Sequence, residues 1–403
     1  MFGFGKEKRA DTVAQSDPRM AVFLGIGATS AAGETVTVES ALGVPAVWAA
    51  VNFLAGTLAG LPLNIYSLSG TSRTRIKTGL GPILHDAVND GMSSFDWRKY
   101  TFEQALTHGR GVSYIERNAN GAVVNIWPLD PLKLTVKLSN GSKRYEYNYN
   151  GRKVFYEASE IIDLPMMLRS DMLSARSPIS TNRDVIGLAQ AATKYGAKFF
   201  ANGGVPPFAI TGPIKSAGGL QRAADDLGRA VAKASADNSP AVALPEGHDI
   251  KPIGTDPEKL QFVETQRFQV EQIARIYSLP PTFLQDLTHG TFSNTEQQDL
   301  HFVKHTLKRW VEQFEQELNL KILGRKPGSR YIEMNVDGLL RGDFKTRMEG
   351  YSLGVQSGTF TPNENRRREN LPDVEGGDQA FMQGANMPLD GNLEKPKEGE
   401  NGA

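Results

Sequence analysis

The sequence between residues 257 and 319 decides how this chain folds. It reads PEKLQFVETQRFQVEQIARIYS over residues 257–278 and SNTEQQDLHFVKHTLKRWVEQFEQELN over residues 293–319. Both stretches repeat apolar residues at the three- and four-residue spacing of an amphipathic helix. The sequence therefore predicts two long helices, joined by a polar connection that includes residues 284–294.

The first of these helices carries an aromatic residue on its polar face. A wide apolar stripe contains Leu260, Val263, Val270, Ile273, Ala274, Ile276 and Tyr277. The opposite face holds Glu264, Glu271, Gln272 and Arg275, with Phe268 in its middle. Single exposed apolar residues are common, but a helix contacted from both sides by neighbouring subunits also explains this pattern. We therefore predict that Phe268 and Arg275 lie at a subunit interface.

The second helix carries basic residues and two histidines near its start. Ser293 and Glu296 form a predicted capping box. His301 and His305 have the i, i+4 spacing that brings two imidazoles to one metal. Phe302 stands where the metalloprotease pattern needs Glu, so a solvated or interface role is favoured. Nearby are Lys304, Lys308 and Arg309, for which a solvated helix face is favoured over a face that contacts DNA or a neighbour.

Composition limits the classes of function. The 403 residues are enough for about two or three domains. The 45 basic residues balance 45 acidic ones, whereas proteins that bind DNA tightly usually carry a basic surplus. There is no cysteine, which excludes disulfides and thiolate metal sites. No apolar run at the N-terminus resembles a signal peptide.

The familiar catalytic motifs are missing. Residues 27–35, GATSAAGET, miss the phosphate-loop spacing, and Glu34 stands where Lys is needed. GIGATS lacks the third glycine of the dinucleotide fingerprint, and no GxSxG occurs. We therefore expect no catalytic residue, no cofactor and no metal, and no enzymatic activity. One alternative is a metal-dependent hydrolase that uses His301 and His305.

The remaining segments predict a mixed α+β protein. Residues 44–63, VPAVWAAVNFLAGTLAGLPL, are favoured as a buried helix, because Asn52 and Thr57 interrupt the run and no Lys or Arg flanks it closely. A membrane-attached protein that uses this segment is the second alternative.

Asn-Gly pairs at 120, 140 and 150 predict an antiparallel β-meander over residues 112–165. Helices follow from 179 to 203 and from 343 to about 358, and Thr361 with Glu364 forms another capping box. Arg366, Arg367 and Arg368 suit the end of that helix, with DNA or partner binding as the less favoured reading.

Taken in order, short stretches along the chain resemble the portal protein family of long-tailed bacteriophages and phage-like particles. They are LPL at 61–63, GVSYI at 111–115, WPLDP at 127–131, SPI at 177–179, LPP at 279–281, TFSNTEQ at 291–297 and GGD at 376–378. No single motif is chemically specific, but their order and spacing are, over about residues 44–378. The sequence departs from the family at Asp163, where His is common, at Ala175, where Gly is usual, and at Lys308, where Pro often stands.

The resemblance implies the portal fold: a helical stem, an α/β wing around the meander, a small clip and a short helical crown, in a ring oligomer. The implied parts are a flexible N-terminal arm (1–39), wing (40–177), stem helix (178–203), clip (204–256), second stem helix (257–283), tunnel loop (284–294), the rest of the wing (295–340), crown (341–380) and a disordered tail (381–403).

The resemblance also implies the function and the partners. A ring of twelve subunits would stand at one capsid vertex, and double-stranded DNA would pass through it during packaging and ejection. The implied partners are the large terminase subunit, the major capsid protein and the head–tail adaptor protein, with no membrane. The implied location is the virion, with the host cytoplasm during assembly. In the tunnel loop, the predicted DNA-facing residues are Thr288, His289, Gly290, Thr291 and Phe292.

Overall fold

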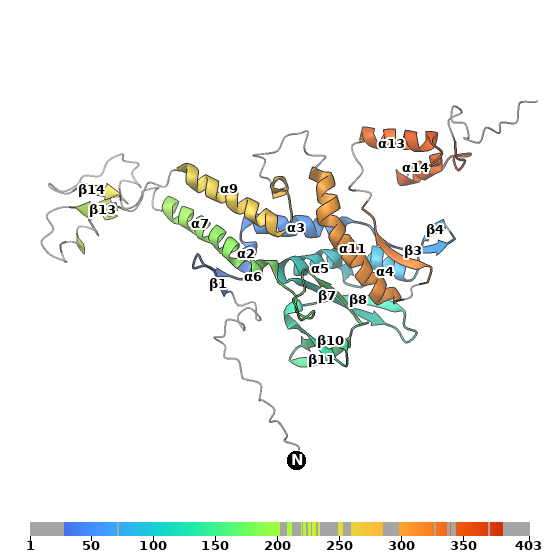
Figure 1. Ribbon diagram of the computed structural model, residues 1–403, viewed down its shortest axis with the longest axis horizontal. Coiled ribbons are helices and arrows are strands. Elements are labelled where there is room, and N and C mark those ends of the chain that lie inside the picture. Colours follow the sequence, from blue (N-terminus) through green and yellow to red (C-terminus); the bar gives the residue numbers. More distant parts are fainter. Residues whose placement is uncertain are drawn as a thin grey trace, which may run out of the picture. The chain divides into compact units, whose positions relative to one another are not determined.

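The computed structural model describes two compact units, which divide at Asn335 and are treated separately (Figure 1). The described residues are 28–70, 72–201, 208–211, 219, 221–222, 225–226, 228–230, 233, 249–252, 259–284, 298–325, 328–336, 339, 344–369 and 371–381. The predicted tunnel loop, apart from Leu284, and most of the predicted clip lie outside these residues. So does the predicted capping box at Ser293.

The core of the first unit is built around α3 (Pro45–Gly60), α5 (Ser94–His108) and α11 (Lys308–Leu318). Proline at the first position starts α3, and seven apolar residues of α3 are buried. The prediction of a buried helix over residues 44–63 is therefore confirmed. Among the residues that the structure describes, no helix is both long and apolar enough to cross a membrane.

Large aromatic side chains fill the space between α5 and α11. The Trp97 and Phe314 ring centroids are 5.7 Å apart, and Phe102 lies 5.1 Å from Phe314. Trp310 meets Phe102 edge-on at 6.0 Å. All four side chains are 0% or 1% exposed. Aromatic residues bury large areas and gain further from such tilted and edge-on geometries. This cluster, called here the aromatic core, anchors α11 to the N-terminal half of the unit.

The predicted meander divides into two three-stranded antiparallel sheets, so the expectation of one continuous meander is wrong. One sheet has the order β12-β7-β8 and the other β11-β10-β9. The bounds are β7 Arg110–Arg117, β8 Val123–Leu129, β9 Leu134–Ser139, β10 Ser142–Tyr149, β11 Arg152–Glu157 and β12 Ile161–Pro165. Between β8 and β9, Asp130 caps a 3-10 turn at Pro131–Lys133, and the two strands do not pair. The two sheets share a small core of Val112, Leu129, Tyr145, Tyr147 and Ile161.

Two of the Asn-Gly pairs form the tight turns that the sequence predicts. Asn140 has φ 50° and Gly141 has φ 77°, and Asn150 and Gly151 have 49° and 82°. Positive φ at both central residues is the requirement of a two-residue type I′ hairpin. These turns set the register of β9, β10 and β11.

A third sheet, β15-β3-β4, joins distant parts of the chain: β3 (Leu63–Ser69), β4 (Ser72–Arg75) and β15 (Arg330–Met334). Side chains of α11 bond to the edges of two sheets. Glu315 Oε1 accepts from the Met334 backbone N–H at 2.6 Å in β15, and Gln313 Nε2 donates to the Pro165 carbonyl at 2.7 Å in β12. Helix α11 therefore links β15, 19 residues from Glu315, to β12, 148 residues from Gln313.

Residues 28–39 depart from the expectation of a flexible N-terminal arm over residues 1–39. They contain the hairpin β1 (Ala28–Thr29) and β2 (Thr35–Val36) and the start of α2 (Val38–Leu42). Thr37 and Ser40 form a capping box for α2. The Ala31 backbone N–H donates to Asp184 Oδ1 at 2.9 Å, so the hairpin is attached to α7. Residues 1–27 lie outside the described residues.

The other elements of the first unit are short or lie around the core. They are α4 (Leu80–His85), β5 (Ala87–Asn89), β6 (Met92–Ser93), α6 (Pro178–Thr181), α7 (Arg183–Ala201), β13 (Phe208–Thr211), β14 (Asp249–Pro252), α9 (Lys259–Ile276), a 3-10 turn (Pro281–Leu284) and two π-helical segments (Phe302–Leu307 and Asn319–Leu323). The helix predicted from residue 179 is interrupted at Asn182, between α6 and α7.

The second unit contains α13 (Phe344–Gln356) and α14 (Pro362–Arg368). The predicted capping box is present: Thr361 accepts from the Glu364 backbone N–H, and the Glu364 side chain accepts from Thr361. Proline at the first helical position completes this helix start. Both helices agree with the sequence within a few residues.

Candidate functional site

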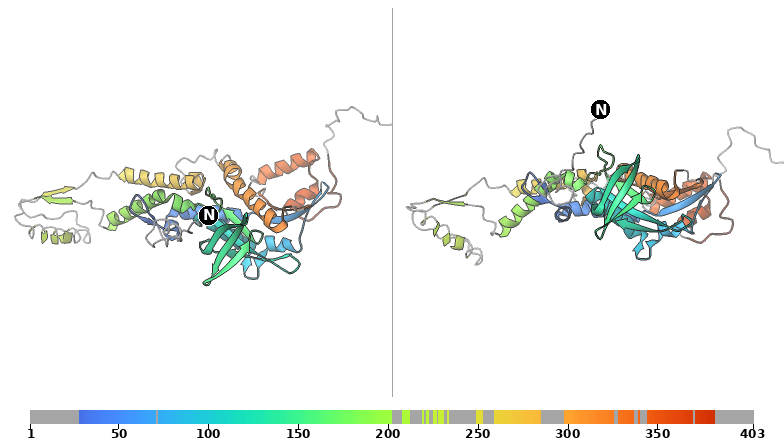
Figure 2. Two further views of the ribbon diagram at one scale, coloured as in Figure 1. Left: turned by 60° about the horizontal axis from the view of Figure 1, so that its bottom comes forward. Right: turned by 90° about the horizontal axis from the view of Figure 1, so that it is seen from below.

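Helices α7 and α9 run side by side, as two views show (Figures 1 and 2). The buried residues of α7 are Ile186, Gly187, Ala189 and Gly196, and Gly187 lies against Ser30 of the N-terminal hairpin. Among the α9 residues whose burial is described, from 264 to 276, Gln269, Ile273 and Ala274 are buried, and so is Tyr277 directly after the helix. The Tyr277 hydroxyl donates to the Leu106 carbonyl at 3.3 Å, and burial raises the pKa of Tyr277. This bond connects the end of α9 to α5.

The outer faces of the pair carry large apolar side chains in solvent. Phe268 is 52% exposed on α9, and Tyr195 and Phe200 are 51% and 72% exposed on α7. Arg275 is also exposed and pairs with Glu271 at 3.4 Å. The structure thus places Phe268 and Arg275 on the open side of α9, the position that an interface residue needs. The buried face of α9 differs from the predicted apolar stripe. Gln269, which the stripe does not include, is buried, whereas Val270 and Ile276, which it includes, are only partly buried.

The predicted DNA-facing residues Thr288, His289, Gly290, Thr291 and Phe292 lie outside the described residues, but both flanks of their segment are described. The Thr282 hydroxyl donates to Gln298 Oε1 at 2.8 Å. Phe283 stacks on Phe53 at 5.2 Å and lies 4.8 Å from Phe302. The structure therefore brings the two ends of the 285–297 segment together beside α3.

The histidines considered as metal ligands are neighbours on one exposed helix face. The ring centroids of His301 and His305 are 4.4 Å apart. Within the part of the chain that the structure describes, no group of three or more His, Cys, Asp or Glu side chains is arranged to hold a metal.

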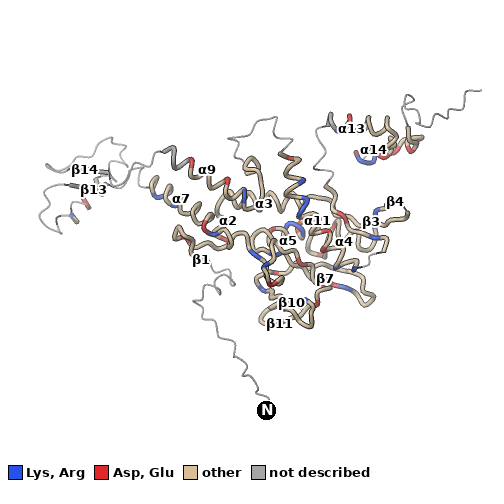
Figure 3. Tube along the Cα trace, in the orientation of Figure 1, with Lys and Arg blue, Asp and Glu red and all other residues tan. Residues whose placement is uncertain are grey.

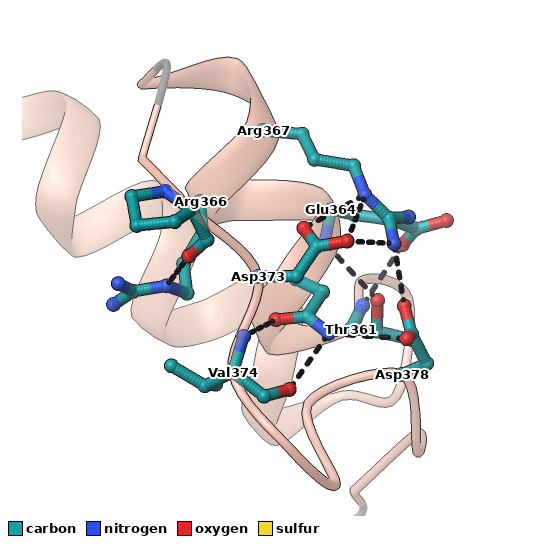
Figure 4. A network of polar contacts seen from close by, with 9 residues as sticks. Thr361, Glu364, Arg366, Arg367, Asp373, Val374 and Asp378 are labelled. Atoms are coloured by element: carbon teal, nitrogen blue, oxygen red, sulfur yellow. Dashed lines mark hydrogen bonds and ion pairs between the residues drawn. The ribbon is translucent and has the colours of Figure 1, made fainter.

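The three arginines of the second unit make contacts within that unit, and Figure 4 shows those of Arg366 and Arg367. Arg367 pairs with Asp373 at 2.7 Å and with Asp378 at 3.0 Å, and its hydrogen bond to Asp373 raises its pKa. Arg366 Nε donates to the Pro372 carbonyl at 2.7 Å. The Arg368 guanidinium lies 4.0 Å from the centre of the Phe360 ring. These contacts, rather than a helix-end effect alone, account for the three arginines.

A buried polar cluster joins the two sheets to α11, and the sequence did not predict it. Arg110 Nε lies 3.0 Å from Asp163 Oδ1 in an ion pair, although the N–H does not point along a hydrogen bond. The Tyr145 hydroxyl donates to Asp163 Oδ2 at 2.8 Å, and burial raises the pKa of Tyr145. Glu317 of α11 accepts from the Asp163 backbone N–H at 2.8 Å. The only signal in the sequence was Asp163, standing where the family often has His.

Comparisons with known structures identify the fold. The chain is similar to the structure of an HK97-family phage portal protein from Corynebacterium diphtheriae, with a TM-score of 0.56 and 16% identity over 78% of this chain and 97% of that one. It is also similar to a chain in the virion of a native gene transfer agent particle, with a TM-score of 0.56 and 18% identity over 92% of this chain and 97% of that one. The fold is therefore a portal protein fold, mixed helix and sheet with antiparallel sheets.

Sequence comparisons give the family. The family model described as phage portal protein matches residues 45–370. The probable portal protein of Streptomyces phage phiC31 is 34% identical over 394 residues, which cover 93% of this chain and 85% of that protein. The portal protein of Enterobacteria phage HK97 is 27% identical over 357 residues, covering 87% and 84%. The chain belongs to the phage portal protein family, whose members are structural proteins of the virion's portal vertex.

Proposed function

We propose that this chain forms a closed ring of twelve subunits at one capsid vertex, and that double-stranded DNA passes through the ring during packaging and ejection. The family match over residues 45–370 is the observation that carries this function. A second observation supports assembly. Phe268 stands 52% exposed on α9, where an apolar side chain gains from contact with a neighbouring subunit.

In this proposal the segments have the roles implied by the portal fold. Residues 40–177 and 295–340 form the wing, 178–203 and 257–283 the stem, 204–256 the clip and 341–380 the crown. The tunnel loop, 284–294, faces DNA through residues 288–292. The partners are the large terminase subunit during packaging, the head–tail adaptor protein afterwards and the major capsid protein around the ring. In this proposal the chain itself catalyses no reaction, because the family it belongs to is a structural one.

Assembly is tested with the variant Phe268→Asp and negative-stain imaging of the full-length protein. Wild-type protein should show annular particles with a central hole. The variant should shift the population strongly toward monomers, because an interface charge would have to be desolvated. Tyr149→Asp, at a 61% exposed aromatic residue on the tip of the β10–β11 hairpin, is the matched control and should leave rings intact. A folded wild-type monomer that forms no ring in any salt would refute the proposal.

The tunnel loop is tested by replacing residues 289–292 with a Gly-Ser linker. Rings should still form, since the helices on both sides of the segment are unchanged. Particles that carry this variant should package or retain less DNA, measured as DNA per particle. Normal packaging together with normal retention would show that the loop does not contact DNA.

A further inference from the structure

One exposed helix face in the described chain is strongly basic. The helix that runs from residue 298 through α11 buries Phe302, Val303, Thr306, Leu307 and Trp310, and the side chains between them point to solvent. We call the exposed residues His301, Lys304, His305, Lys308 and Arg309 the cationic face. Figure 3 shows basic residues following one another along this helix. Exposed Leu300 lies one turn before Lys304, and exposed Glu312 lies one turn after Lys308, so an apolar residue and an acidic residue border the cationic face at its two ends.

Ordinary ion pairing within the helix accounts for only part of this face. Lys308 lies 3.5 Å from Glu312. Among the described residues, no carboxylate lies within ion-pair distance of Lys304 or Arg309. Lys304 and Lys308 are four residues apart, and like charges at this spacing destabilise a helix. An external anion would offset this repulsion.

The cationic face is held rigidly from behind. The Thr306 hydroxyl donates to the Ser278 carbonyl at 2.6 Å, which fastens the π-helical segment to the end of α9. Phe302 packs on Phe53 at 5.5 Å. The Arg309 guanidinium lies 5.5 Å from the centre of the Trp310 ring, and its partial burial lowers the pKa of Arg309. These contacts fix the helix backbone, which reduces the backbone entropy lost when the face binds a ligand.

We propose that the cationic face binds the phosphate backbone of double-stranded DNA. From His301 to Arg309 the helix extends at most ~12 Å, the length at an α-helical rise of ~1.5 Å per residue, because the π-helical segment Phe302–Leu307 rises less per residue. One DNA strand presents a phosphate about every 3.4 Å along the axis, so this face spans at most about three or four phosphates. Cores of protein interfaces are depleted in Lys and enriched in aromatic residues, the opposite of this composition. Such contacts are independent of DNA sequence. This inference rests on the proposed function, because it supplies the DNA.

The test uses the full-length wild-type ring and the double variant K304Q/K308Q with a fluorescent linear 30-base-pair duplex. Binding is measured over a salt series from ~50 to ~200 mM. Each lysine that contacts a phosphate should contribute about 1 to the slope of log affinity against log salt, so the variant should lose up to about 2. K304R/K308R should restore the slope. The control is K137Q/K153Q, which removes the same charge from two lysines that both pair with Glu146 on β10, and its slope should not change.

Three outcomes would overturn the inference. The slope could be equal in K304Q/K308Q and wild type, or the control could lose as much as the variant. The third is that the variant fails to form rings while its DNA binding is unchanged, which would assign the face to an acidic surface of a neighbouring subunit. Rings are imaged before binding is measured. If wild type forms rings and only the slope prediction fails, the inference is wrong and the proposed function stands.

Discussion

The aromatic core and the α7–α9 helix pair differ in how far they bury their large apolar side chains. In the aromatic core, Trp97, Phe102, Trp310 and Phe314 are each at most 1% exposed. In the helix pair, Tyr195, Phe200 and Phe268 are each more than half exposed, and a glutamine occupies a buried position. The side chains of the aromatic core are buried by residues of the same chain. In contrast, Tyr195, Phe200 and Phe268 of the helix pair stay more than half exposed among the described residues.

This difference separates residues that stabilise the single subunit from residues that gain from contact with a neighbouring subunit. A core with complementary aromatic packing contributes stability to each subunit before any subunit meets another. A helix pair with apolar outer faces gains more when a neighbour covers those faces. We therefore expect substitutions in the core to act on subunit unfolding, and most substitutions on the helix pair to act more weakly on it.

The largest expected effect is that of Trp310→Ala. Removing a fully buried tryptophan leaves a cavity between α5 and α11 and should cost about 3–5 kcal/mol of unfolding free energy. Chemical denaturation of the subunit measures it. Trp48→Ala, at a tryptophan that is 58% exposed on α3, is the control and should stay within about 0.5 kcal/mol. Similar losses for the two variants would mean that the aromatic core is not the centre of stability.

Arg110→Met should have the next largest effect. It leaves the Asp163 carboxylate buried with Tyr145 and without its cation, which should cost about 3 kcal/mol. The exposed pair Arg144–Glu157, 3.5 Å apart, supplies the control. Arg144→Met should change the unfolding free energy by less than about 1 kcal/mol, because exposed pairs contribute little. If Arg110→Met is equally mild, the cluster does not hold the two sheets and α11 together.

Gly187→Ala tests the attachment of the N-terminal hairpin to α7. A Cβ at this position would lie 2.2 Å from Ser30 Oγ and 2.4 Å from Ser30 Cβ, so the hairpin must shift. We expect a loss of about 1–3 kcal/mol, with faster hydrogen exchange confined to residues 28–36. In Gly56→Ala the new Cβ meets nothing within 4 Å, so that variant should gain about 0.5–1 kcal/mol. Unchanged exchange in the hairpin of Gly187→Ala would show that it is not packed on α7.

Gln269→Leu should have the smallest effect, and it should stabilise. Gln269 is 4% exposed, and its Oε1 atom has no hydrogen-bond partner among the described residues. Leucine removes this unsatisfied acceptor and should raise the unfolding free energy by about 1 kcal/mol. Thermal unfolding provides the measurement, with Gln266→Leu on the exposed face as a neutral control. A loss of stability would mean that the amide has a partner in the assembled protein.

Local rules in the sequence predicted the elements that depend on a few neighbouring residues. The turns at Asn140 and Asn150 follow from the tolerance of Asn and Gly for positive φ. The start of α14 follows from the spacing of Thr361 and Glu364. The burial of α3 follows from a 16-residue helix without a charged side chain. Family membership likewise followed from the order and spacing of short motifs.

Contacts between distant residues could not be predicted in the same way. The division of the meander into two sheets depends on which strands find partners, and the Asn-Gly turns do not specify how β7 pairs with β12. The ordered hairpin at residues 28–36 depends on a bond to Asp184, about 150 residues away. For the candidate site, the sequence identified Phe268 as an apolar residue on a polar face, and the structure shows it exposed.

By itself, the sequence determined the buried helix α3, the start of α14, the tight turns at Asn140 and Asn150 and the family, because each depends on short-range spacing that one stretch of chain contains. Only the tertiary structure decided that Arg110, Tyr145, Asp163 and Glu317 meet in one buried cluster. The same holds for the cationic face, where burial of Phe302, Thr306 and Trp310 turns the basic residues outward together. The physical reason is that burial and charge pairing depend on which surfaces meet, and long-range packing sets those meetings.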